Sequence, residues 1–208
     1  LKNPDDHQKY LLDWLPESRQ WSYTLGTTFK HYGNNWYHFF VLSRSGLYNK
    51  VEKYTGNDRH NPKTIDYRSG ESENKFRFEH HRYAANGFKL QVGAGIEYAH
   101  YDNTTARRLF AAGEAIDQYY SRALNMWKWA VFGQVSRSFF SERLALSLGL
   151  RADGCNYTGK TAALYRQISP RFSFSYAFDE RWSLNGNIGR YYQLPAYTTL
   201  GFADAGGV

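Results

Sequence analysis

The sequence lacks any long apolar run. Its mean hydropathy is −0.68, and no stretch approaches the roughly 18 consecutive apolar residues of a transmembrane helix. This excludes a helical membrane protein. It does not exclude a transmembrane β-barrel, because the strands of a barrel are apolar on one face only.

Several motifs that carry chemistry are also missing. Cys155 is the only cysteine, so we expect no disulfide framework and no cysteine-based zinc site, and we place this residue in a loop. There is no Gly-x-Ser-x-Gly nucleophile motif, which disfavours an enzyme. His80 and His81 would point to opposite faces of a strand and could not chelate one metal ion. We therefore expect neither a metal nor a cofactor.

The chain carries a net charge of +7, which would suit a nucleic-acid binder. However, the basic residues are spread through the loops and the polar positions of strands and do not form a stripe. We therefore expect no nucleic-acid partner.

Strict alternation of apolar and polar residues is the strongest pattern in the sequence. It predicts strands, because successive side chains of a strand point to opposite faces. The residues expected on one apolar, lipid-facing surface are Leu144, Leu146, Leu148, Leu150, Phe172 and Phe174.

A soluble antiparallel sheet with one buried face is the commoner cause of such alternation. Three features favour a membrane barrel instead. The runs reach about ten residues, whereas soluble strands average roughly five or six. No helical pattern is long enough to cover a sheet face. Aromatic residues make up 18% of the chain, and tryptophan and tyrosine gather near strand ends, as in an interfacial girdle. The girdle residues would be Trp21, Trp36, Trp127, Trp182, Tyr98, Tyr101 and Tyr191.

The pattern predicts an all-β, antiparallel chain of about eight strands. Short turns are expected at 31–35, 84–87, 141–143 and 179–181, and Asn86-Gly87 is a strong hairpin signal. Long connections are expected at 44–71, 102–125 and 153–165, the second with loosely helical spacing.

With the short turns on the periplasmic side, an even number of strands leaves both chain ends on the extracellular side. Complete single-chain barrels keep their ends in the periplasm, so we expect residues 1–208 to be a segment of a larger barrel. No secretory signal or lipidation motif opens the chain, which agrees with a missing start. An eight-stranded barrel can close by itself, so the alternative is a small outer-membrane barrel that acts as an adhesin or a structural anchor.

The polar positions of the strands would face a watery or plugged interior. There they would form ion pairs and contact a plug or a passing substrate. These positions are Glu73, Lys75, Arg77, Glu79, Lys89, Gln91, Glu97, Arg151, Asp153 and Arg171.

Several stretches resemble a known family. They are QKYLLDWLPESRQWSYTLGTTFKHYG, FFVLSRSGLYNKVEKYTGND, DYRSGESENKFRFEHHRY and the series LALSLGLRADGCNY, ISPRFSFSYAF and LNGNIGRYYQLPAY. From about Gln8 to Phe202 the chain is similar to the barrel of TonB-dependent outer-membrane receptors, particularly those of Bacteroides-like bacteria.

The resemblance implies a 22-stranded barrel in the outer membrane of a Gram-negative bacterium, closed by a plug domain. Such a receptor imports a scarce nutrient, such as a siderophore, haem, cobalamin or an oligosaccharide. It would contact the inner-membrane TonB complex through the plug, the surrounding lipid, and in some cases a surface lipoprotein. Twenty-two strands of about ten residues need roughly 220 residues, so this chain would be a partial barrel domain without the plug and the remaining strands.

Overall fold

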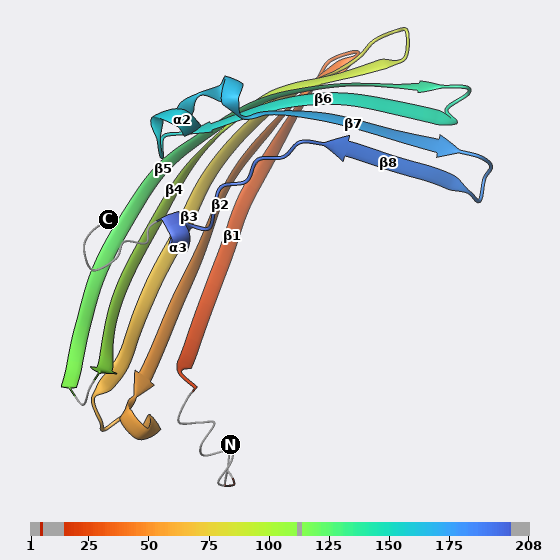
Figure 1. Ribbon diagram of the computed structural model, residues 1–208. Helices are drawn as coiled ribbons and strands as arrows, with labels where there is room; N and C mark the ends of the chain where they lie inside the picture. Colours follow the sequence, from red (N-terminus) through yellow and green to blue (C-terminus); the bar gives the residue numbers. More distant parts are fainter. Residues whose placement is uncertain (1–4, 6–14, 112–113, 201–208) are drawn as a thin grey trace.

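The computed structural model describes residues 5, 15–111 and 114–200 and contains one antiparallel sheet of eight strands in sequence order (Figure 1). The strands are β1 (Glu17–Tyr32), β2 (Trp36–Tyr54), β3 (Lys63–Tyr83), β4 (Phe88–Ala111), β5 (Glu114–Phe139), β6 (Leu144–Cys155), β7 (Ile168–Ala177) and β8 (Ser183–Gly189). Short helical turns are η1 (Thr55–Asn57), α2 (Gly159–Ala162), η2 (Leu164–Arg166) and α3 (Tyr197–Leu200). The prediction of an all-β chain with eight antiparallel strands is confirmed.

The hairpins β1–β2, β3–β4, β5–β6 and β7–β8 close with short turns at one end of the sheet. The β3–β4 turn contains Gly87, whose φ of 84° is a left-handed conformation that glycine adopts at little cost. Its N–H donates to the carbonyl of Ala84 at 3.0 Å. The Asn-Gly signal therefore marks a real hairpin.

Two of the long connections expected from the sequence are wrong. Residues 44–54 continue β2, and residues 63–71 belong to β3. Residues 102–111 and 114–125 lie in β4 and β5, and no helix forms in these described ranges. The strands are therefore much longer than the alternation alone indicates.

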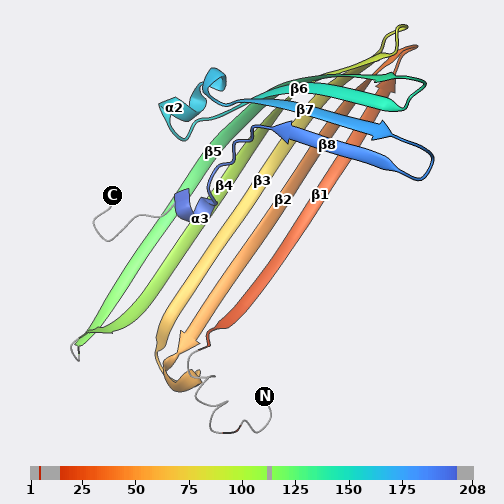
Figure 2. The ribbon, with the colours of Figure 1, turned by 45° about the vertical axis from the view of Figure 1, so that its right-hand side comes forward.

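The register assigns the side chains to two faces of opposite chemistry. We call the face crossed by residues 190–200 the inner face, and both views show α3 on the hollow side of the curved sheet (Figure 2). The opposite, outer face carries the leucine row of β6, where Leu148 is 59% exposed, and its neighbours Phe172 and Phe174 on β7. Leu25 and Phe29 of β1 are also exposed on the outer face, while Arg44 interrupts it and bonds to Tyr23 and Asn74.

The small buried core lies on the inner face. Ala99 of β4, Met126 of β5 and Cys155 of β6 are almost fully buried, and Leu194, Tyr197 and Leu200 pack against them. Cys155 is thus the last residue of β6 and is not in a loop as expected. Most large apolar side chains instead remain exposed on the outer face.

Two of the expected girdle residues lie on the inner face. Tyr101 is 2% exposed and stacks toward Tyr197. It lies three residues after the outward Tyr98, so strand alternation turns it inward. Tyr191 lies over the guanidinium of Arg171, with 4.7 Å from that carbon to the ring centre.

Within residues 15–111 and 114–200, no ladder joins β8 to β1, so both are edge strands. None of the helices described is both long and apolar enough to span a membrane.

Candidate functional site on the inner face

An open hollow of about 1020 Å³ lies over the inner face. Its floor comes from the strands β2 to β6, and one of its walls comes from residues 192–197. Most of the polar positions singled out in the sequence line this hollow, because they occupy the inward phase of adjacent strands.

The centre of the hollow is a set of alternating charges. The register places Lys75 beside Glu97 and Glu97 beside Lys128 across three strands. The Lys75 ammonium lies 2.6 Å from Glu73 and 3.4 Å from Glu97. The Lys128 ammonium pairs with Glu97 and lies 3.4 Å from Glu73. Two carboxylates and two ammonium groups thus compensate each other in a partly buried position.

Tyr197 of α3 completes this set. Its hydroxyl donates to Glu73 and accepts a hydrogen bond from Lys128 at 2.5 Å. The Lys128 ammonium also lies 5.0 Å from the centre of the Tyr197 ring. Residues 190–200 are therefore fastened to the inner face by polar bonds as well as by the packing of Leu194 and Leu200.

A second cluster is centred on Glu79, which is 5% exposed. This carboxylate pairs with Arg77, accepts from the Gln91 amide at 2.8 Å and lies 2.6 Å from Nε2 of His81. Four side chains from β3 and β4 thus satisfy one another, as a buried carboxylate requires.

An aromatic ring links the two sides of the hollow. Phe132 of β5 lies between the guanidinium carbons of Arg77 and Arg151, at 4.7 and 5.8 Å from its centre. Arg151 in turn donates to Asp153 at 2.7 to 2.9 Å. Both arginines are held in defined orientations and remain partly accessible.

A comparison with known protein families identifies the family of this chain. The family model described as TonB dependent receptor-like, beta-barrel matches residues 2–207. The chain belongs to this family. No curated protein matches the chain. The family is one of outer-membrane receptors with a transport role, not of enzymes, and its members generally interact with TonB.

In this TonB-dependent receptor-like barrel, Lys89 and Arg171 lie away from the main hollow. Lys89 lines a smaller hollow of about 420 Å³ near the short turns, among serine and asparagine side chains. Arg171 contacts Tyr191. The register still places both on the inner face.

The inner face of this barrel sheet offers fixed donors, fixed acceptors and aromatic rings. Such a surface suits a polar ligand or the polar side of a packed domain. Among the described residues, no group of three or more histidine, cysteine, aspartate or glutamate side chains is arranged to hold a metal ion. Sequence reasoning missed Tyr197, because it lies 124 residues from Glu73 and only the folded chain brings them together. It also missed Lys128, although this residue occupies the polar phase of its strand between Trp127 and Trp129.

Proposed function

We propose that this chain forms part of the wall of an outer-membrane receptor of a Gram-negative bacterium, which imports a nutrient with energy delivered by TonB. The observation that carries the proposal is the pair of opposite faces. An exposed apolar outer face fits lipid, and a charged inner face with a large hollow fits a hydrated or plugged passage. The family match supports the same assignment.

The proposed ligand is a siderophore, haem, cobalamin or an oligosaccharide. The residues proposed to contact it, or a plug domain, are the inner-face polar residues and above all Arg77 and Arg151. Their guanidinium groups flank Phe132 and combine charge with an aromatic ring, a pairing that recognises both anionic and ring-shaped ligands.

The chain is proposed to be a segment of a larger, 22-stranded barrel. The outer edges of β1 and β8 support this, because no other strand in the described part of the chain pairs with them, and backbone groups inside a membrane must find partners in further strands. The same edges weigh against a self-contained small barrel that serves as an adhesin or anchor. A surface lipoprotein remains a proposed partner, as in the Bacteroides-like receptors that the sequence resembles.

The decisive experiment is nutrient uptake by cells that carry the complete reading frame containing this chain. Uptake of radiolabelled candidate nutrients is measured with and without an intact inner-membrane proton gradient. We expect one nutrient class to accumulate only when the gradient is present. Accumulation of none of them, with the protein folded in the membrane, contradicts the proposal.

Variants then connect the uptake to the hollow. Arg77→Ala combined with Arg151→Ala is expected to reduce uptake about tenfold or more, because two charged contacts are lost. Arg122→Ala on the same face, outside the hollow, serves as the control and should leave uptake unchanged.

A further inference from the structure

On the outer face, charged side chains replace apolar ones beyond the aromatic residues of β1 and β2. Trp21 and Tyr48 stack on this face with their ring centres 4.5 Å apart. Away from the short turns, the next outward positions are Arg19 beside Lys50 and then Glu17 beside Glu52. Apolar rows thus give way to charged rows at one level of the sheet, as expected where a barrel leaves the hydrocarbon layer.

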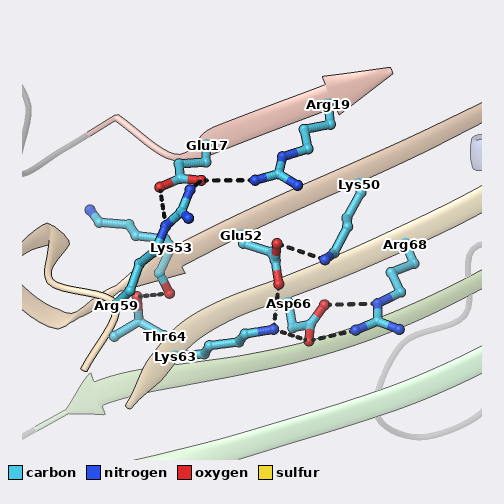
Figure 3. Close-up of polar contacts among 10 residues, drawn as sticks. All are labelled: Glu17, Arg19, Lys50, Glu52, Lys53, Arg59, Lys63, Thr64, Asp66 and Arg68. Atoms are coloured by element: carbon cyan, nitrogen blue, oxygen red, sulfur yellow. Dashed lines mark hydrogen bonds and ion pairs between the residues drawn. The ribbon is translucent and has the colours of Figure 1, made fainter. Parts of the chain in front are cut away.

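Eight charged side chains gather here in two neighbouring groups of ion pairs, one around Glu17 and one around Glu52 and Asp66 (Figure 3). Together we call them the outer charge cluster. Its basic members are Arg19, Lys50, Arg59, Lys63 and Arg68, and its acidic members are Glu17, Glu52 and Asp66.

Each carboxylate of the cluster holds two basic groups. Glu52 pairs with Lys50 at 2.7 Å and with Lys63, which also reaches Asp66 at 2.9 Å. Asp66 accepts from Nε and Nη2 of Arg68 at 3.2 and 3.3 Å. Glu17 accepts from Nε and Nη2 of Arg59 at 3.1 and 2.7 Å. Arg19 lies 3.8 Å from the same carboxylate.

The arginines are the accessible layer of this cluster. The side chains of Arg19, Arg59 and Arg68 are 63%, 61% and 60% exposed. Those of their acidic partners are less exposed, at 44% for Glu17, 9% for Glu52 and 22% for Asp66. A guanidinium carries five N–H donors, and the bonds to the carboxylates use two of them in Arg59 and Arg68. The acids therefore orient the arginines and leave donors available to a further anion.

The acids also keep their charge. Hydrogen bonds from Lys50 and then Lys63 lower the pKa of Glu52, and the bond from Arg59 lowers the pKa of Glu17. The outer charge cluster thus stays ionised at neutral pH with five positive charges against three negative ones.

We propose that the outer charge cluster binds the phosphate groups of the glycolipid in the outer leaflet. Three observations converge on this ligand: the excess of positive charge, the exposed and oriented guanidinium groups, and the position on the lipid-facing side just past the stacked aromatic rings. Guanidinium groups match phosphate geometry, and basic residues at a membrane surface attract anionic headgroups. The proposal rests on the membrane placement given under the proposed function.

The test is a titration of the folded full-length protein, held in a neutral detergent, with phosphorylated lipid A and with the same lipid after removal of its phosphates. Calorimetry measures both affinities. We expect tight binding of the phosphorylated lipid only. The variant R19Q/R59Q/R68Q should bind it about a hundredfold more weakly, from roughly fivefold for each lost charge. R19Q alone should weaken binding about fivefold. It leaves the hydrogen bonds of Arg59 and Arg68 in place, so it tests the proposal even if the triple variant does not fold.

The control variant is R122Q/R143Q/R181Q, which removes the same charge from the inner face and from two short turns. It should bind as tightly as the unmodified protein. Equal binding of both lipids, equal weakening in both triple variants, or binding of inorganic phosphate as tightly as of the phosphorylated lipid would overturn the proposal. Capture of a surface protein through these arginines without lipid binding would overturn it as well.

A separate measurement keeps the two proposals apart. Flotation with vesicles of neutral lipid reports membrane insertion without any phosphorylated glycolipid. A protein that floats but shows no preference for phosphate retains the proposed receptor function and loses the proposed lipid site.

Discussion

Gly93 of β4 lies beneath Phe132 on the inner face. A Cβ atom at this position would be 2.4 Å from the Phe132 ring and 2.6 Å from the carbonyl oxygen of Phe78, which belongs to the neighbouring strand. The ring is flexible at its far end, but the carbonyl is held by the sheet. Gly93 therefore allows Phe132 to lie between Arg77 and Arg151.

We expect Gly93→Ala to destabilise the protein by about 1–3 kcal/mol, the usual cost of overpacking. Gly95→Ala is the matched control, because it is on the same strand and face and its Cβ would meet only the Phe76 carbonyl at 3.5 Å. Urea unfolding from lipid vesicles gives both values. Equal losses in the two variants would show that strand glycine as such, and not the contact with Phe132 and Phe78, is responsible.

Glu52 provides a prediction on pH. Its pKa lies below the ordinary 4.5 because Lys50 and Lys63 donate to the carboxylate. A pKa that is lower in the folded state means that Glu52 stabilises the fold above pH 4.5, and that this stabilisation is lost as the pH falls through the folded pKa. We expect Lys63→Gln to move the pKa of Glu52 upward, as followed by carbon NMR of the labelled carboxyl group. Lys160→Gln, in α2, should leave it in place. An unchanged pKa in Lys63→Gln would contradict the bonding described.

At the scale of elements, sequence alternation predicted the strand segments with outer apolar side chains far better than the charged segments that continue the same strands. Leu144 to Leu150 and Phe172 to Phe174 alternate cleanly, since one side is apolar and the other is polar. Beyond the aromatic residues the outer side chains become charged, as at Asp66 and Arg68, so the contrast between faces disappears while the strand continues. The end of the pattern marks the end of the apolar surface and not the end of the strand.

The final segment could not be predicted by local pattern at all. Residues 190–200 contact β3, β4 and β5 through single side chains such as Tyr197. No periodicity of the sequence indicates such a contact. The polar residues of the hollow were recognised because they share strand phase, whereas their partner on α3 depends on the path of the chain.

The reactivity of the Cys155 thiol reports whether residues 190–200 stay packed on the inner face, because Cys155 is 2% exposed beneath Leu194, Tyr197 and Leu200. Tyr197→Phe removes the bonds to Glu73 and Lys128 but keeps the ring. We expect Cys155 to react with a maleimide about tenfold faster or more in this variant, given the usual strength of hydrogen bonds to charged groups. Tyr192→Phe, which lines the same hollow, is the control. Unchanged labelling in Tyr197→Phe would mean that apolar packing alone holds the segment.

At the scale of the whole molecule, the outer face has the height of a membrane. Trp36 and Tyr48 lie about 12 residues apart on β2, which is roughly 40 Å along a strand and about 30 Å across a bilayer for a strand tilted by about 40°. The apolar band of outer-membrane barrels is about 25 Å tall. The outer apolar rows therefore match the hydrocarbon layer in extent as well as in composition.

Leu148 is the residue at which this match is tested most directly, because it lies within the outer leucine row of β6 and is 59% exposed. An arginine there would meet hydrocarbon and should cost about 2–4 kcal/mol near the middle of the bilayer. Its neighbour Ser147 points to the inner face, where Ser147→Arg would meet water and should cost less than about 1 kcal/mol. Reversible folding into phospholipid vesicles, followed by tryptophan fluorescence, measures both. If the two substitutions cost the same, the outer face does not contact lipid, and the apolar rows must be covered by protein instead.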